Sequence, residues 1–276
     1  MTVSGIDVAS YQSTDYSTAG LSFVMVKATE GSSYVNPRHA AQVATGRGHG
    51  LVVGHYHFAR PGSMTAQVTY FLQHAAPGTG DVLALDWEDA GVSGAEKDEF
   101  IKHLQAASPA HRVVLYCNRD FWLNRDRTSF CGDGLWIADP NAPAGHPQIT
   151  HPWTFHQYSE TGGVDHDVAN FASAAALRTW ASKGHAPAYE PFPGVAWFTV
   201  GRRSPIVAAM HDRLVAVGCN HYQSSANKDV IGSGDIASYE AWQRKYNAEH
   251  HKGWTGAALK WPPGKETWDA LRVPNV

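Results

Sequence analysis

Short apolar runs alternate with helical patterns through the first two thirds of the chain. The strand-like runs are "VSGIDV", "LSFVMVKA", "LVVGHYHF", "DVLALDW", "RVVLYCN", "GLWIAD" and "WTFHQY", and the helical patterns between several of them are "PRHAAQVATGRGHG", "MTAQVTYFLQHAA" and "EKDEFIKHLQAA". Because strand and helix alternate, we expect parallel βα units, and seven or eight such units favour a closed barrel of TIM type. About 180 residues is short for this barrel, so we expect it to be irregular and incomplete, with several helices missing or abbreviated.

The alternation of strand and helix patterns stops after "FASAAALRTWASKG", which predicts a closing helix that ends at Gly184. The next stretch, "HAPAYEPFPG", has the composition of a linker. Three further helical patterns follow, and Ser204 is a candidate N-cap of the first. The sequence therefore predicts an α/β domain at residues 1–183, a linker at 184–194 and a small all-α domain at 195–276.

Composition and charge exclude some classes of partner. The chain of 276 residues carries 22 Lys and Arg against 25 Asp and Glu, and no long basic run suggests a nucleic-acid surface. There is no run that would insert into a membrane, and "MTVSGIDVASYQ" enters a predicted strand at once instead of forming a secretion leader. The cysteines Cys117, Cys131 and Cys219 form neither a zinc pattern nor an even disulfide set, so we expect reduced thiols, with a Cys117–Cys131 bridge as the alternative.

Acidic residues gather where three predicted strands end. Asp7 ends the first strand, Asp86 and Glu88 end "VLALDWE", and Asp165 and Asp167 follow "WTFHQY". The C-terminal ends of barrel strands meet at one mouth, and residues two apart on a strand point to the same face. Mutual repulsion should raise one pKa in such a cluster. A protonated acid beside ionised carboxylates is what glycosidic cleavage requires.

Two other chemistries fit these residues less well. His55 and His57 have the spacing of metal ligands on a strand, but no third ligand accompanies them, so no metal is expected. The acids also approach a chitinase pattern, Asp-x-x-Asp-x-Asp-x-Glu, but Ala84 stands where that pattern requires its second Asp. The residues predict no cofactor.

Several motifs in this order resemble those of the glycoside hydrolase family 25 muramidases: "GIDVASYQ", "FVMVKATEGSSYVNPR", "GHYHFARP", "LALDWED", "VLYCN", "LWIA" and "FHQYSETGGVDHDVANF". The resemblance covers residues 1–183. It implies an incomplete βα barrel that cuts the β-1,4 bond from N-acetylmuramic acid to N-acetylglucosamine in bacterial peptidoglycan.

The resemblance also implies roles for the acids. The family's acidic quartet falls on Asp7, Asp86, Glu88 and Asp167, with Asp165 as the alternative fourth member because this chain reads "DVANF". Glu88 would be the general acid/base. Asp86 would be either the nucleophile or the group that orients the substrate's own acetamido oxygen. Asp7 and Asp167 would tune pKa values and hold sugar hydroxyls.

Aromatic and polar residues within the same motifs are candidate sugar contacts, with core packing as the alternative for each. Tyr56 and Tyr116 are favoured because each sits at the end of a predicted barrel strand. The full set is Tyr34, Tyr56, Phe58, Tyr116, Trp136 and Gln157.

The C-terminal helical part partly resembles peptidoglycan-binding domains of three helices. Trp242, Trp261 and Trp268 are the matching aromatic positions and hence candidate wall-binding residues, with core filling as the alternative. Together the two parts resemble a phage endolysin, which would stay in the host cytoplasm until lysis and then act on the wall. A secreted bacterial lysozyme and a catalytically silent wall-binding protein are the alternatives, and the sequence does not determine the oligomeric state.

Overall fold

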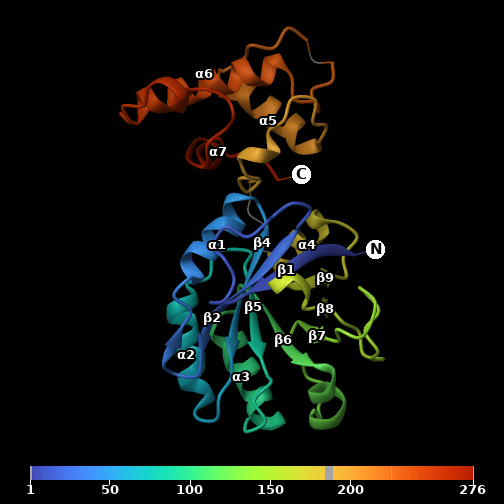
Figure 1. The fold of residues 1–276 in the computed structure, drawn as a ribbon. Coiled ribbons are helices and arrows are strands. Elements are labelled where there is room, and N and C mark those ends of the chain that lie inside the picture. Colours follow the sequence, from blue (N-terminus) through green and yellow to red (C-terminus); the bar gives the residue numbers. More distant parts are fainter. Residues whose placement is uncertain (1, 184–188, 225, 276) are drawn as a thin grey trace. The chain divides into compact units, whose positions relative to one another are not determined.

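The computed structural model describes residues 2–183, 189–224 and 226–275. The predicted helix stop Gly184 and residues 184–188 of the predicted linker lie outside these ranges. The chain divides into two compact units (Figure 1). The first comprises Met1–Arg47 and Leu51–His185, and the second comprises Gly48–Gly50 and Ala186–Val276.

The first unit is built on an eight-stranded barrel, counted over its described residues. In sheet order from β1 the barrel strands are β1 (Val3–Val8), β9 (Asp165–Ala169), β8 (Phe155–Ser159), β7 (Gly134–Ala138), β6 (Arg112–Asn118), β5 (Val82–Asp86), β4 (Val52–Phe58) and β2 (Phe23–Glu30). Pairing of β1 with β2 closes the barrel, and a two-residue strand, β3 (Tyr34–Val35), adds to β2. All barrel neighbours are parallel except β9, which is antiparallel to β1 and β8. The predicted irregular barrel is confirmed.

The helices around the barrel are incomplete, as expected from the length of the domain. Figure 1 shows α1 (His39–Gly48), α2 (Met64–Ala75) and α3 (Gly94–Ala107) along the outside of the barrel, and α4 (Ala174–Ala181) follows the last strand. Between β6 and β7 the chain makes only a short π-helix, η1 (Phe121–Arg125), and between β8 and β9 a 3-10 turn, η2 (Thr161–Gly163). The described segments 9–22 and 139–154, which follow β1 and β7, contain no helix.

Successive side chains on a strand point alternately outward to the helices and inward to the barrel, which gives the core two layers. On β5, Leu83 and Leu85 face outward and pack with residues of α2 and α3. Val82 and Ala84 face inward and pack with residues of β4 and β6. Asp86 continues the inward face, so the filling of the barrel changes from apolar to acidic where the strand ends.

Two glycines make room for the large side chains that fill the barrel. A Cβ on Gly5 would lie 2.4 Å from the ring of Phe23, and a Cβ on Gly54 would lie 2.0 Å from the sulfur of Met25. Both contacts are too short for a real side chain, so a larger residue at either position would force the Phe23 ring or the Met25 side chain to move.

The second unit is helical, as predicted. Its helices are α5 (Pro205–Ala216), α6 (Ser233–Glu249) and α7 (Lys265–Leu271), with 3-10 turns η3 (Val195–Trp197) and η4 (Gly256–Leu259). Ser204 is the N-cap of α5, and its hydroxyl accepts a hydrogen bond from the Ile206 amide at 3.2 Å. The side chains between the helices form one aromatic-rich core.

The tryptophans expected to bind the wall lie mostly in that core. Trp268 is fully buried and donates to the Glu190 carbonyl at 2.9 Å, and Trp242 is buried and donates to the Thr267 carbonyl at 2.8 Å. Only Trp261 of the three is partly exposed. The structure thus differs from the wall-binding expectation for Trp242 and Trp268, because buried rings pack the unit and offer no free face to a ligand.

The described residues also show the state of the cysteines and the character of the helices. The thiols of Cys117, Cys131 and Cys219 are all buried and free, so the alternative Cys117–Cys131 bridge is not formed. Among the residues that the structure describes, no helix combines the length and apolar character needed to cross a membrane.

Candidate active site

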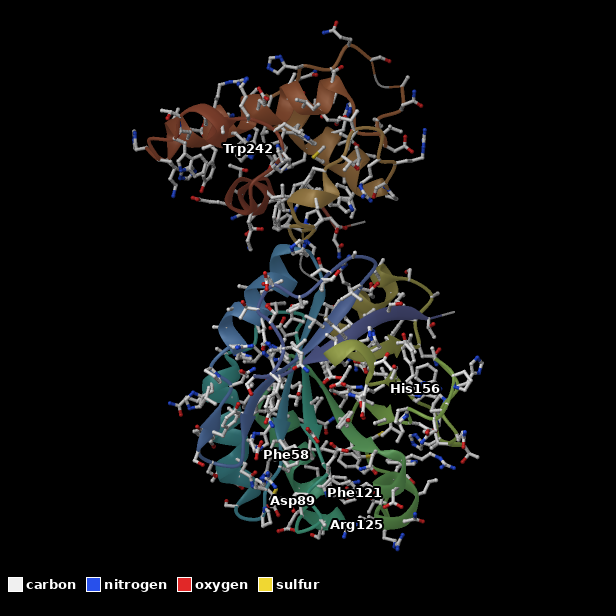
Figure 2. All side chains as sticks on the ribbon, viewed as in Figure 1. Phe58, Asp89, Phe121, Arg125, His156 and Trp242 are labelled. Carbon is white, nitrogen blue, oxygen red and sulfur yellow. The ribbon has the colours of Figure 1, made fainter. Side chains whose placement is uncertain are left out.

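A cavity of about 220 Å³ opens at the C-terminal ends of the barrel strands. Figure 2 shows Phe58, Asp89, Phe121 and Arg125, which lie at or just beyond the ends of β4, β5 and β6, at this end of the barrel. The cavity is rich in acids and aromatic rings. Its lining comprises Asp7, Tyr56, Asp86, Glu88, Tyr116, Trp136, Gln157, Glu160 and Asp165.

A relay of hydrogen bonds holds Asp7 on β1. The Gln157 amide nitrogen donates to Asp7 Oδ2 at 2.6 Å, and the Tyr116 hydroxyl donates to Gln157 Oε1 at 2.9 Å. Burial raises the pKa of Asp7 well above its usual range, and the charge of Asp165 adds to the rise. Gln157, expected to contact sugar, therefore also serves as the partner that orients Asp7.

The two candidates for the fourth acid both lie on β9, but in different surroundings. Asp167 is fully buried and accepts a hydrogen bond from Trp136 Nε1 at 2.7 Å, while its Oδ2 has no partner among the described residues. Burial raises the pKa of Asp167 strongly, and the charge of Asp7 raises it further. Asp165 is half-buried, pairs in register with Asp7 and lines the cavity directly. The structure brings both acids to Asp7.

Asp86 and Glu88 share the cavity although β5 ends between them. Asp86, the last strand residue, is buried, and its Oδ1 has no hydrogen-bond partner in the described part of the chain. Burial raises the pKa of Asp86 well above its usual range, and the charge of Glu88 adds to this. Glu88 is half-buried, and its Oε1 accepts a hydrogen bond from the Asn118 amide nitrogen at 3.0 Å.

The cause of the raised pKa of Glu88 differs from the sequence-based expectation. Burial is the largest cause, and the like charge that contributes is that of exposed Glu160. Mutual repulsion among the acids at the strand ends was expected as the cause instead. Burial raises the pKa values of Asp7 and Asp86 and so disfavours their charged forms, which weakens their repulsion of Glu88.

Lys27 lies close enough to the acids to offset part of their charge. Lys27, in the second half of β2, lowers the pKa values of Asp86 and Glu88 by its charge. Its ammonium pairs with Glu30 at 2.6 Å and lies 5.0 Å from the Phe58 ring centroid and 5.6 Å from that of Tyr34. Phe58 and Tyr34, expected to contact sugar, are not among the lining residues and surround this lysine instead.

The other predicted aromatic residues form one wall of the cavity. The Trp136 ring meets Tyr116 edge-on at 4.4 Å and Tyr56 at 6.0 Å between centroids. Sequence reasoning missed Asn118 and Glu160. Both stand at the ends of strands, Asn118 as the last residue of β6 and Glu160 directly after β8, so the argument that found the acids would have found them too.

The histidines of β4 are packing residues of the outer face. His55 contacts Asp81 and His39, both at 2.9 Å, and His57 contacts Thr29 at 2.7 Å. Both rings are fully buried. No group of three His, Cys, Asp or Glu residues that could hold a metal ion occurs within the described ranges.

Comparison with known proteins assigns the barrel to a family. The family model described as glycosyl hydrolases family 25 matches residues 6–167, more than half of the chain. The chain belongs to this family. It is therefore a glycoside hydrolase, and the match coincides with the unit that carries the acidic cavity.

Individual relatives agree with this assignment. The chain is 33% identical to lysozyme M1 of Streptomyces globisporus over 60% of its own length and 66% of that protein. It is 35% identical to an N,O-diacetylmuramidase of Chalaropsis sp over 44% of its length and 68% of that protein. The chain thus spans about two thirds of these relatives. The solved bacterial lysozyme of Streptomyces coelicolor is 27% identical with a TM-score of 0.54, covering 66% of this chain and 98% of that one.

Proposed function

We propose that this protein is a muramidase that hydrolyses the β-1,4 bond between N-acetylmuramic acid and N-acetylglucosamine in bacterial peptidoglycan. The observation that carries the proposal is the pairing of half-buried Glu88 with buried Asp86 in one cavity at the strand ends. Two carboxyl groups in unlike surroundings are what glycosidic hydrolysis uses. The names of the relatives, lysozyme and N,O-diacetylmuramidase, support this choice of substrate.

Glu88 would be the general acid and then the general base. Asn118 occupies Oε1 of its carboxyl group, so the transferable proton belongs on Oε2. Burial raises the pKa of Glu88 and thereby keeps the proton available as the leaving sugar oxygen departs. After the leaving sugar has gone, the same carboxylate would take a proton from the attacking water.

Asp86 would act on the other side of the reaction. Its unpartnered Oδ1 is available to attack the anomeric carbon or to accept a hydrogen bond from the substrate's acetamido N–H. Either action uses the ionised carboxylate, which the nearby charge of Lys27 favours. Asp7 and either Asp167 or Asp165 would then tune these pKa values, and Tyr56 and Tyr116 would contact the sugars.

Mass spectrometry of digested peptidoglycan tests the bond assignment. New fragments should carry N-acetylmuramic acid at their reducing ends. If N-acetylglucosamine appears there, the enzyme is a glucosaminidase and the proposal is wrong. Newly freed amino groups without new reducing ends would indicate an amidase or peptidase. Wall binding without any turnover would indicate the silent binding protein.

We also propose that the second unit binds the cell wall and that the protein acts as a phage endolysin. The two-unit organisation supports this role, since a wall-binding unit keeps a hydrolase at its insoluble substrate. Fractionating the cells that produce the protein tests it. An endolysin would collect in the cells until abrupt lysis, whereas a secreted bacterial lysozyme would accumulate in the medium during growth.

A further inference from the structure

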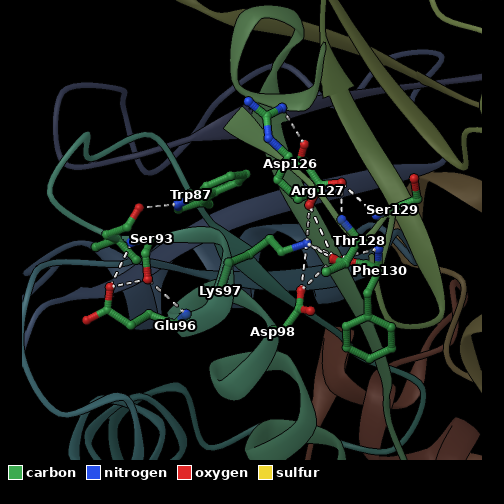
Figure 3. A network of polar contacts seen from close by, with 11 residues as sticks. Trp87, Ser93, Glu96, Lys97, Asp98, Asp126, Arg127, Thr128, Ser129 and Phe130 are labelled. Atoms are coloured by element: carbon green, nitrogen blue, oxygen red, sulfur yellow. Dashed lines mark hydrogen bonds and ion pairs between the residues drawn. The ribbon is translucent and has the colours of Figure 1, made fainter. Parts of the chain in front are cut away.

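A buried lysine lies behind the acidic strand end (Figure 3). Lys97, on α3, has a fully buried side chain, and its ammonium lies 2.6 Å from Asp126 and 2.7 Å from Asp98. The same ammonium donates to the Phe130 carbonyl at 2.7 Å and to Thr128 Oγ1 at 3.2 Å. Burying a charge is costly unless it is fully partnered, and these contacts fulfil that condition.

This ion pair joins α3 to the segment that ends η1. Asp126 directly follows η1, and its backbone amide donates to the Phe121 carbonyl at 2.9 Å. Its carboxylate also accepts from the Ser129 amide at 2.6 Å, so the pairing with Lys97 fixes the start of segment 126–130. The position of η1 against α3 therefore depends on this charge pair.

Between these two elements lies Trp87, the residue that separates Asp86 from Glu88. Its ring is 5.6 Å from the Lys97 ammonium and meets the Phe121 ring edge-on at 5.1 Å. Its Nε1 donates to the Val92 carbonyl at 2.9 Å. β5 ends at Asp86, but the Trp87 backbone amide still donates to the Tyr116 carbonyl of β6 at 2.9 Å, so the backbone at Glu88 is held through Trp87, both by this bond and by the packed indole ring.

The carboxyl group of Glu88 is held from the η1 side as well. The Phe121 backbone amide donates to Asn118 Oδ1 at 2.9 Å. That bond fixes the orientation of the Asn118 amide and directs its Nδ2 to Glu88 Oε1. A shift of η1 would therefore move both the Trp87 anchor and the Asn118 donor.

We propose that Lys97 is a positioning residue for the reaction, acting through Asp126 and η1 to hold Glu88 and its Asn118 partner in place. Replacing a buried ion pair with uncharged groups is often neutral for stability, so a need for folding alone does not explain this pair. Holding a general acid within fractions of an ångström does explain it, because misplacement by about 1 Å costs up to about 100-fold in rate.

The test is a mutant cycle on the full chain, assayed on soluble peptidoglycan fragments. The charge-pair variant combines Lys97→Met with Asp126→Asn and Asp98→Asn, so that the lysine and both of its carboxylate partners lose their charge and no unpaired buried ion remains. We expect kcat to fall by about 10- to 100-fold with KM within about twofold. Asn118→Ala should also lower kcat, and the combined variant should lose clearly less than the product of the two separate losses, because one of the two routes from η1 to Glu88 passes through the Asn118 donor. The basic limb of the pH–rate profile should move in the same direction in the charge-pair variant and in Asn118→Ala.

A matched control removes another ion pair of the same barrel. Arg112→Met breaks a partly buried pair with Asp133, 3.0 Å long, at the start of β6 and hence at the other end of the strands. It should lower the melting temperature without changing kcat or the pH–rate profile. If the charge-pair variant does not fold, Phe121→Leu, which keeps both charges and weakens the contact with Trp87, replaces it in the cycle.

Unchanged kcat in a folded variant, a loss confined to KM, or losses that multiply with that of Asn118→Ala would overturn the inference. The inference rests on the proposed role of Glu88, so Glu88→Gln is measured in the same assay. An active Glu88→Gln enzyme refutes the proposed function itself. An inactive one beside a fully active charge-pair variant refutes only the role of Lys97.

Discussion

Replacing Glu88 with Gln isolates the proton transfer from the architecture of the site. Gln keeps the shape of the side chain, and its oxygen still accepts the 3.0 Å hydrogen bond from Asn118. Glu88 forms no ion pair in the described structure, so the change breaks none. Only the transferable proton is lost. General acid catalysis is worth about 10²–10⁴-fold, which corresponds to roughly 3–5 kcal/mol of activation free energy.

Asp89→Asn is the matched control, one residue further along. Asp89 pairs with Arg60 at 2.8 Å and accepts a hydrogen bond from the Gly91 amide at 2.7 Å. Asn keeps an oxygen for the Gly91 amide and loses only the pairing with Arg60, whose side chain is half exposed. Such pairs contribute about 0–1 kcal/mol. The control should stay within about twofold of wild-type activity, a negligible loss on the scale of general acid catalysis.

Turbidity clearing of wall suspensions, run beside thermal melts, measures both variants. Glu88→Gln should melt no lower than the wild type, because burial raises the pKa of Glu88 and disfavours its charge, while it should lose at least about 100-fold in rate. A stable Glu88→Gln protein within tenfold of wild-type activity would refute the assignment of the general acid. An inactive but stable Asp89→Asn protein would show that the wrong acid of the segment had been chosen.

Further predictions concern the buried acid, the two units and the second core. Asp7→Asn should stabilise the protein above about pH 4, and the gain should grow as pH rises toward the raised pKa of Asp7. Over this range the folded state retains the carboxyl proton of Asp7 and the unfolded state loses it, and thermal melts measured across pH test this. Residues 190–276 alone should pellet with Gram-positive walls, while residues 1–186 should cleave soluble fragments normally and intact walls slowly; equal rates on intact walls contradict this. Trp268→Ala should cost about 3–5 kcal/mol in denaturant unfolding, and Trp261→Ala, already partly exposed, clearly less.

The barrel could be predicted because strand-like apolar runs that alternate with helical patterns are compatible with only a few folds. Asp7, Asp86 and Glu88 could be placed at one mouth because parallel strands end together, whereas Asp165 and Asp167 reach it from the start of the antiparallel strand β9. The strand β9 was missed because "DHDVA" carries two acids and a histidine in five residues. Those polar residues resemble a loop in sequence, yet they form the antiparallel strand that separates β8 from β1.

The contacts of individual side chains could not be predicted from the strand pattern. Phe58 lies at the end of β4, as Tyr116 lies near the end of β6, but the Lys27 ammonium lies near the Phe58 ring and the cavity forms elsewhere. Lys97 gave no sequence signal at all, because a lysine in "EKDEFIKHLQAA" looks like an ordinary exposed helix residue. Its burial depends on Asp126, which lies 29 residues away in the chain.

The acidic strand end follows from the different surroundings of its two carboxyl groups. Burial raises the pKa of Asp86 more completely than that of half-buried Glu88, so Asp86 is the costlier of the two to ionise. In the proposed reaction a cationic sugar forms beside Asp86 in the transition state, and this positive charge favours the carboxylate when it is needed. The cost of burying Asp86 is therefore offset in the transition state and not in the empty site. For the same reason, Asp86→Asn should raise stability near neutral pH while abolishing turnover. An Asp86→Asn variant that is both less stable than the wild type and inactive would contradict this account.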